Sequence, residues 1–243
     1  MSSFQSNSEN RRAKGKGDII VVDNKTAFSS EAYDSDVRAT IPNYCSFHDE
    51  TIDLIKTINE VPDIWLDTGC GTGTFGVKVE KYFPSTKCIM ADPSESMLSR
   101  AKDKLNSENN TYIISGTQDL SCQNDSIDVI TSIQSHHYLD LEGRQKATRN
   151  CFRMLKAGGV YVTFENIRKN TDIGNIIGLE RWKNFQVQNG KSICDAEKHI
   201  GRFNNDYFPI TLESHIGVLV DAGFSVAEVL WVSAMQAGFY AVK

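Results

Sequence analysis

A dense cluster of glycines directly follows one short apolar segment of the chain. Ile64, Trp65 and Leu66 form the apolar segment, and the sequence then reads DTGCGTGTFG from Asp67 to Gly76. Glycine lacks a Cβ atom, so the chain can turn tightly and its backbone can touch a ligand. A helix that begins after this turn points its free N–H groups and its positive dipole end at the same place. The cluster therefore predicts a strand, a turn that binds a nucleotide-like ligand, and a helix.

Apolar segments and amphipathic helices alternate after this turn. The helical pattern is clearest at residues 43–58 and 211–222, where one face of each segment is apolar. The expected strands lie at residues 64–67, 87–91, 112–114, 127–132, 160–164, 225–232 and 235–242. This alternation predicts an α/β fold with a doubly wound, Rossmann-like sheet. The last two strands would form an antiparallel hairpin at one edge of a mostly parallel sheet.

The sequence pattern divides the chain into five parts. Residues 1–17 are polar and basic and predict a disordered tail. We expect residues 18–60 to form an N-terminal segment and helix over the active site, and residues 61–165 to form the cofactor-binding core. Residues 166–210 interrupt the alternation with scattered aromatic residues and predict a small helical cap or lid. Residues 211–243 would complete the core sheet with the final helix and hairpin.

The overall composition excludes several classes of protein. The 243 residues are 40% hydrophobic with a net charge of −5, and this negative balance argues against a nucleic-acid partner. No apolar run is long enough to span a bilayer, and we do not expect the polar, basic N-terminal residues to act as a secretory signal. The six cysteines form no C-x-x-C pair, and the histidines lack the spacing of metal ligands. We therefore expect a cytoplasmic protein with free thiols, no bound metal and no membrane contact.

Two ligand fingerprints overlap in the glycine cluster. Its last three glycines match the dinucleotide motif G-x-G-x-x-G, and Asp92 follows roughly 20 residues later, as that motif requires. The pattern Asp67-x-Gly69-x-Gly71-x-Gly73 instead matches the first motif of class I S-adenosyl-L-methionine (SAM)-dependent methyltransferases. The acid before the glycines suits the ammonium group of SAM. The terminal hairpin is standard for methyltransferases and rare in dinucleotide dehydrogenases, so we favour SAM.

The chain thus resembles a class I SAM-dependent methyltransferase over roughly residues 29–165 and 211–243. Besides the glycine cluster, the resemblance rests on Asp92 at a strand end and on the segments SIDVI (126–130) and LKAGG (155–159). It implies that the turn surrounds the methionine part of SAM and that Asp92 binds the ribose hydroxyls. The residues that it implies for cofactor binding are Asp67, Gly69, Cys70, Gly71, Gly73, Asp92, Pro93, Thr117, Gln118, Asp119, Gln134 and Arg38.

The adenine contact departs from the family pattern. The position that usually carries an acid for the adenine edge aligns with Thr117, in the sequence Gly116-Thr117-Gln118-Asp119. Thr117 and Gln118 can hydrogen-bond adenine, whereas Asp119 can instead point to solvent. The sequence leaves these alternatives open.

Two further segments suggest residues near the reacting group. Residues 33–42, YDSDVRATIP, resemble a YDxxxRxxIP-type element of a methyltransferase subset that includes tRNA (cmo5U34) methyltransferase-like proteins. There the segment folds over the SAM site, so Tyr33 would contact the SAM carboxylate or the substrate and Arg38 would pair with a carboxylate. His136, after the fourth strand, is a candidate general base. His137 follows directly in the sequence. The alternative is that one of these two histidines caps the next helix and packs on the sheet, which we favour for His137.

The resemblance implies an enzyme that moves the methyl group of SAM to a small-molecule nucleophile by in-line displacement and releases S-adenosyl-L-homocysteine (SAH). The N-terminal element suggests a carboxy-SAM synthase-like or tRNA wobble-uridine-modifying enzyme as the alternative. A carboxy-SAM enzyme needs an arginine that faces the transferred carboxylate, and the sequence alone does not place one. A non-catalytic SAM-binding module is a further alternative. The oligomeric state is open, with a homodimer as one option.

Overall fold

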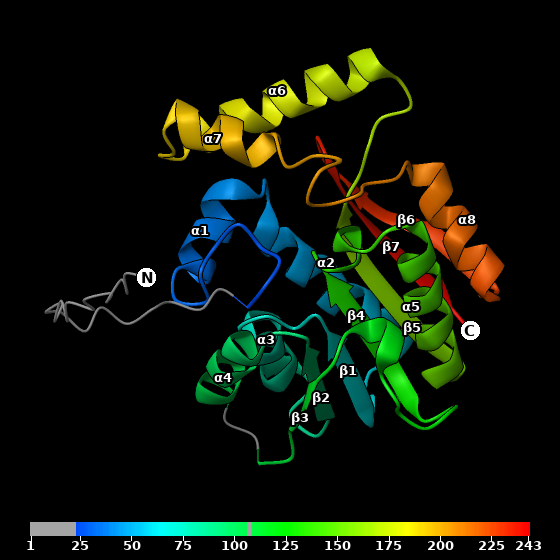
Figure 1. The fold of residues 1–243 in the computed structure, drawn as a ribbon. Coiled ribbons are helices and arrows are strands. Elements are labelled where there is room, and N and C mark those ends of the chain that lie inside the picture. The colour runs from blue at the N-terminus through cyan, green and yellow to red at the C-terminus, as the bar shows by residue number, and fades with distance from the viewer. Residues whose placement is uncertain (1–22, 106–107) are drawn as a thin grey trace, which may run out of the picture.

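A seven-stranded sheet forms the centre of the molecule in the computed structural model, which describes residues 23–105 and 108–243 (Figure 1). The expected tail, residues 1–17, lies outside the described residues. The strand order is β3-β2-β1-β4-β5-β7-β6. The strands are β1 (Ile64–Thr68), β2 (Lys87–Asp92), β3 (Thr111–Ile114), β4 (Ile127–Ile133), β5 (Leu155–Asn166), β6 (Val226–Val232) and β7 (Gln236–Val242).

The first five strands pair in parallel, and β7 lies antiparallel to both β5 and β6. This arrangement confirms the predicted α/β sheet with an antiparallel C-terminal hairpin. The switch point between β1 and β4 leaves a crevice at the carboxyl ends of the strands, where open α/β sheets bind ligands.

Helices cover both faces of the sheet and create two apolar cores. The helices α2 (Tyr44–Ile58), α3 (Thr74–Tyr82) and α4 (Glu95–Lys104) pack on one face, and α5 (Leu141–Met154) and α8 (Leu212–Ala222) pack on the other (Figure 1). Successive residues of β1 point into opposite cores, as Trp65 and Leu66 show. Strands that are buried on both faces need continuous apolar runs, which is why the strands that cross the middle of the sheet are so hydrophobic.

The ends of the helices follow their sequence signals. Ser94 accepts a hydrogen bond from the amide of Met97 (3.1 Å) at the start of α4, as its position before the helix predicts. Thr211 caps α8 in the same way, and Gly223 ends that helix with a φ of 107°. These caps fix where α4 and α8 begin relative to the strand ends.

The start of β5 differs from the prediction. The helical pattern extends through Leu155 and two glycines follow, so the sequence predicts a strand only from Val160. In the structure α5 ends at Met154 and β5 begins at Leu155, which pairs with Ile127. The register of β4 and β5 shifts between Ile127 and Val129, and the amide of Gly158 donates to the carbonyl of Lys243 (2.9 Å). The glycines thus form an irregular strand start that the C-terminus supports.

Two separate segments lie above the carboxyl ends of the strands, and we call them together the cover. The first is residues 23–42, which contain α1 (Tyr33–Thr40); the second is residues 166–210, which contain α6 (Asp172–Gln188) and α7 (Ile193–Ile200) (Figure 1). The fully buried indole of Trp182 donates to the carbonyl of Thr40 (2.7 Å) and joins the two segments. The amide of Phe208 donates to the carbonyl of His137 (2.7 Å) and joins the second segment to the sheet edge.

Candidate cofactor site

The glycine turn between β1 and α3 brings bare backbone to the sheet edge. Gly69 and Gly71 have φ angles of 69° and 54°, in the left-handed region that favours glycine. A Cβ atom at Gly69 would lie 2.2 Å from Ser135 Oγ, so this glycine is required by packing. A Cβ atom at Gly71 would meet no described atom closer than Tyr33 Cε1 at 4.0 Å. Gly71 therefore faces open space, as expected of backbone that contacts a ligand.

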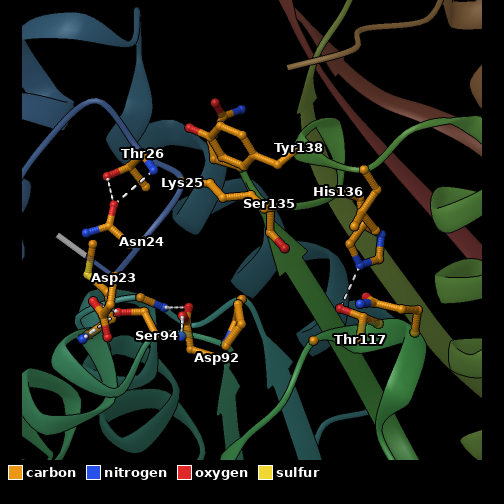
Figure 2. A pocket seen from close by; sticks show the side chains of 18 of the residues that line it. Asp23, Asn24, Lys25, Thr26, Asp92, Ser94, Thr117, Ser135, His136 and Tyr138 are labelled. Carbon is orange, nitrogen blue, oxygen red and sulfur yellow. Dashed lines mark hydrogen bonds between the residues drawn. The ribbon is translucent and has the colours of Figure 1, made fainter. Parts of the chain in front are cut away.

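This open space is a cavity of about 360 Å³ at the carboxyl ends of the strands. In Figure 2, Asp92 and Ser94 lie on one side of it, Ser135, His136 and Thr117 lie across from them, and residues 23–26 complete the wall. Most of the sequence-predicted cofactor residues line it. They are Gly69, Gly71, Asp92, Pro93, Thr117, Gln118, Asp119 and Gln134.

Asp92 presents a carboxylate to this cavity. Its Oδ2 accepts the amide of Gly71 (2.9 Å) and its Oδ1 accepts the amide of Ser94 (2.9 Å). Burial raises the pKa of this carboxyl, and the two amides counteract that rise. Each carboxylate oxygen has a second lone pair, so both can still accept a hydroxyl donor from a ribose diol. The donor set and the bare turn fit the ribose and methionine parts of SAM.

Three predicted residues lie behind the turn instead of on the cavity wall. Asp67 is buried, accepts a hydrogen bond from Thr131 Oγ1 (2.8 Å), and has its pKa raised to about 7 by burial. Asp67 and Cys70 line a separate small void of about 20 Å³. Gly73 packs against α4, since a Cβ atom there would lie 3.0 Å from that of Ala101. Direct contact of these three residues with the cofactor stays a prediction.

The three candidates for the adenine contact differ in how many of their polar atoms already form hydrogen bonds or ion pairs within the protein. Thr117 Oγ1 already shares hydrogen bonds with Thr68 Oγ1 (2.6 Å) and His136 Nε2 (2.9 Å). The Asp119 side chain is 60% exposed and pairs with Lys146 (2.9 Å). Gln118 retains a buried side-chain oxygen without a hydrogen-bond partner among the described residues. Gln118 is therefore the candidate with a free polar atom at this wall.

His136 lines the cavity, but its ring is held within the protein. Nε2 is hydrogen-bonded to Thr117, as Figure 2 shows, and Nδ1 is hydrogen-bonded to the hydroxyl of Tyr161 (2.9 Å). Burial lowers the pKa of His136 to about 4. Both ring nitrogens are engaged and the ring is neutral near pH 7, so a general-base role for His136 stays a prediction that this geometry does not favour.

The N-terminal element places one of its two predicted residues at the site. Tyr33 lines the cavity, whereas Arg38 is exposed on α1 and is not among the lining residues. The element is fastened to the glycine turn by Asp34, which accepts hydrogen bonds from Thr72 (2.6 Å) and Thr74 (2.8 Å) and pairs with Lys104. Val37 packs into the core, and Arg38, the next residue on the helix, points elsewhere.

The structure adds wall residues that the sequence did not suggest. The segment 23–26 closes the cavity, with the Asp23 carboxylate accepting hydrogen bonds from Ser94 Oγ (2.7 Å) and from the amide of Ser96 (3.1 Å). Nothing in the pattern of this segment predicts a wall, because its position depends on contacts with residues about 70 positions away. The sequence predicts Ser94 as a helix cap, but it does not predict that Ser94 also contacts Asp23.

A second space adjoins the cavity, and we call it the side compartment. It measures about 20 Å³ and shares Tyr33, Gln134 and Tyr138 with the cavity wall. Its own residues include Asn166, His199, Arg202 and Tyr207. The Tyr207 hydroxyl and His199 Nδ1 are buried without a hydrogen-bond partner among the described residues. Such buried atoms normally have a partner, so the compartment suits a small polar group.

Arg202 is the cation of the side compartment. Its side chain is 15% exposed, and its guanidinium lies 6.0 Å from the centre of the Tyr138 ring. Nε pairs with Asp206 (2.7 Å), and Nη2 donates to the carbonyl of Lys25 (2.7 Å). Arg202 thus links both segments of the cover beside the cavity, whereas the sequence suggested Arg38 as the arginine that pairs with a carboxylate.

Within residues 23–105 and 108–243, no helix has the length and apolar character needed to cross a membrane. The same residues contain no cluster of three or more side chains arranged to bind a metal ion. All six cysteines are free thiols. Cytoplasmic location and a homodimer stay predictions.

Comparison with known proteins identifies a methyltransferase domain around this site. Residues 66–159 match the methyltransferase domain family. The structure resembles that of a SAM-dependent methyltransferase from Aquifex aeolicus, with a TM-score of 0.58, 17% identity and coverage of 88% of this chain and 98% of that one. It also resembles a Haemonchus contortus phosphoethanolamine N-methyltransferase solved with SAH, with a TM-score of 0.61, 14% identity and coverage of 88% and 57%. Residues 66–159 thus form a methyltransferase domain in a fold shared with SAM-dependent methyltransferases, and SAM is the cofactor that this domain uses.

Curated relatives carry a more specific name. The carboxy-SAM synthase of Nautilia profundicola is 25% identical over 224 residues, which cover 88% of this chain and 92% of that protein. The carboxy-SAM synthase of Trichodesmium erythraeum is 24% identical over 212 residues, which cover 84% and 83%. Each match covers more than four fifths of this chain, far more than residues 66–159.

Proposed function

We propose that the chain forms carboxy-SAM from SAM and holds the incoming carboxylate in the side compartment. The observation that carries the proposal is Arg202, a largely buried cation beside the cavity. A guanidinium can bind a carboxylate through two parallel hydrogen bonds. The alternative reaction suggested by the sequence needed such an arginine, and the long matches to carboxy-SAM synthases support the same reaction.

Other groups in the compartment suit a carboxylate. Burial lowers the pKa of His199 to about 3, so this ring is neutral and can donate one hydrogen bond. The hydroxyl of Tyr207 can donate another. Asp206 competes for Arg202, but its side chain is 55% exposed and can turn to solvent when a ligand carboxylate binds.

The net reaction needs a small carboxylic acid as co-substrate. When bound, SAM supplies an activated methyl group next to its sulfonium. The bond between the donor and its carboxyl group breaks, a carbon–carbon bond forms at the methyl carbon, and the displaced methyl proton passes to the remainder of the donor. The chain's task is to exclude water and align the two reactants, which is worth about 7–11 kcal/mol in well-oriented reactions. The cover supplies that enclosure.

Methyl transfer to a small-molecule nucleophile is the second candidate. It is supported by the cavity of about 360 Å³, whose wall includes the glycine turn and Asp92. The engaged ring of His136 favours acceptors that are already good nucleophiles, because the geometry offers no free imidazole to remove a proton.

Mass spectrometry of the small molecules that the purified protein retains tests the first candidate directly. We expect carboxy-SAM among them, and incubation with SAM and a panel of small carboxylic acids should increase it. Retained SAM or SAH alone, together with methylated products from a panel of thiols and amines, would overturn carboxy-SAM formation in favour of methyl transfer.

A pair of arginine variants tests the carboxylate contact. Arg202→Met should weaken carboxy-SAM binding at least tenfold and leave SAH affinity nearly unchanged, because SAH lacks the additional carboxylate that carboxy-SAM carries on its transferred carbon. Arg181→Met, at an exposed position of α6, is the matched control and should change neither affinity. Equal losses for both ligands in Arg202→Met would mean that Arg202 only braces the cover.

A further inference from the structure

The loop between β4 and α5 forms one wall of the cavity and contains a strained residue. Gln134 has a φ angle of 57°, which is uncommon for a residue with a side chain. Gln134, Ser135, His136 and Tyr138 all line the cavity. Ser135 also packs against Gly69, where even one added Cβ atom would clash. A small shift of this loop therefore changes the space available to the cofactor.

One buried carboxylate holds this loop. Glu165, near the end of β5, is 1% exposed. Its Oε1 accepts the amide of His136 (3.2 Å) and Thr163 Oγ1 (2.6 Å). Its Oε2 accepts the amide of His137 (2.7 Å) and forms a hydrogen bond with His137 Nδ1 (2.8 Å).

The neighbours of Glu165 reinforce the same loop. The carbonyl of Phe164 accepts the amide of Gln134 (2.7 Å), and the side chain of Asn166 contacts His137 Nε2 (3.3 Å). If Asn166 donates to Nε2, then His137 is neutral and carries its proton on Nδ1, facing Glu165. Burial lowers the pKa of His137, in agreement with a neutral ring. Three successive residues of β5 thus fix the whole loop.

Because Glu165 does not line the cavity, it has no direct contact with the cofactor space. We propose that Glu165 is a positioning residue, whose carboxylate sets the loop 134–138 against the glycine turn and thereby sets cofactor affinity. This role concerns the SAM pocket itself and does not depend on which group the enzyme transfers.

Glu165→Gln tests the proposal with a side chain of nearly the same shape. The amide keeps one acceptor oxygen but points an N–H group at donors that the carboxylate accepted. We expect SAH affinity, measured by calorimetry, to fall at least tenfold. Hydrogen exchange of the peptide around residues 133–139 should accelerate at least tenfold, while exchange in the rest of the sheet stays unchanged.

Asp128→Asn is the matched control. Asp128 Oδ2 also accepts two backbone amides, those of Asp63 (3.1 Å) and Ile64 (2.9 Å), but at the opposite edge of the sheet. We expect SAH affinity within about twofold of the wild type, by the same measurement. An unchanged SAH affinity in Glu165→Gln, or an acceleration of exchange across the whole sheet, would overturn the positioning role.

Thr163→Val keeps the proposal testable if Glu165→Gln does not fold. It removes one of the four donors to the carboxylate and conserves the side-chain shape. We expect about a threefold loss of SAH affinity and faster exchange confined to the same loop. Wild-type SAH affinity together with wild-type exchange of the loop would overturn the proposal.

Discussion

The glycine turn and the cover enclose the same cavity but are built differently. The turn is held by backbone contacts between adjacent strand ends, such as the amide of Gly69 on the carbonyl of Ala91 (2.7 Å). The cover is held by side chains that join distant segments, such as Trp182 on Thr40 and Arg202 on Lys25. The glycine turn is thus encoded in a short stretch of sequence, whereas the cover, including the wall of the side compartment, is assembled by long-range contacts.

The largest effect should come from changing the turn. Gly71→Val places a branched side chain in the open space that the turn presents to the cofactor, at a φ angle of 54° that valine disfavours. We expect SAM affinity to fall at least about 100-fold, or about 2.7 kcal/mol, in calorimetry.

Gly190→Val is the control for Gly71→Val, and it separates the effect of filling the cofactor space from the effect of backbone strain. Gly190 also has a positive φ angle, 95°, and no described atom within 4 Å of an added Cβ, but it lies between α6 and α7, away from the cavity lining. SAM affinity should stay near the wild-type value in this variant. A folded Gly71→Val protein with unchanged SAM affinity would show that the turn is not the binding element.

A smaller effect should follow from Asp92→Ala. This change removes a carboxylate that faces the cavity and organises the turn through Gly71 and Ser94. We expect SAM binding to weaken by about 1.5–3 kcal/mol, the range for hydrogen bonds to a charged group. Asp119→Ala, which removes an exposed carboxylate paired with Lys146, should cost less than about threefold. Similar losses in the two variants would contradict the distinct role of Asp92.

The difference between turn and cover also explains what the sequence could predict. The parallel sheet and the C-terminal hairpin follow from alternating apolar segments, and the helix caps follow from Ser94, Thr211 and Gly223. The lining of the cavity by Gly71 and Asp92 follows from local chemistry as well, because both residues sit at strand ends that must meet at one edge.

Residues that depend on packing could not be placed from the sequence. Arg38 and Arg202 are both arginines in polar surroundings, and only the long-range contact of Arg202 with the carbonyl of Lys25 identifies Arg202 as the arginine beside the cavity. His136 stands at the expected strand end, but the engagement of its two nitrogens depends on Thr117 and Tyr161, which come from different elements. Local patterns carry no information about such pairings.

The cover should respond to ligand more than the turn does. Bound SAH touches the first cover segment if it fills the cavity, because residues 23–26 and Tyr33 line it. The second segment is joined to the first by Trp182 and Arg202, so SAH should slow hydrogen exchange in residues 23–42 and 166–210 by about fivefold or more. The fully buried Trp182 and its bond to Thr40 support the alternative of a rigid cap. Equal exchange in both segments with and without SAH would establish the rigid cap.

The smallest effect concerns His136 and the pH dependence of turnover. Because its pKa lies near 4, its charge does not change between pH 5 and 8, and it should add no inflection to the pH profile of kcat in that range. His136→Gln should therefore change the height of the profile without changing its shape. A wild-type inflection near pH 6 that disappears in His136→Gln would instead establish His136 as the titrating base.

The lowered pKa of His136 also makes the free energy of unfolding depend on pH. The pKa of His136 is about 4 in the folded chain and 6.5 when unperturbed, so between these values the unfolded chain binds the proton and the folded chain does not. His48, His199 and His215, whose pKa burial lowers to about 3, act in the same direction, and so does His137, whose pKa burial also lowers. Asp67, whose pKa is raised to about 7, and Asp92, whose pKa is also raised, oppose them. Five histidines outweigh two aspartates, so the free energy of unfolding should rise from pH 4 to 6.5, as urea denaturation can measure. His136→Gln should flatten this rise, because it removes one of the five groups that charge on unfolding. An unchanged slope would mean that His136 is already protonated in the folded protein.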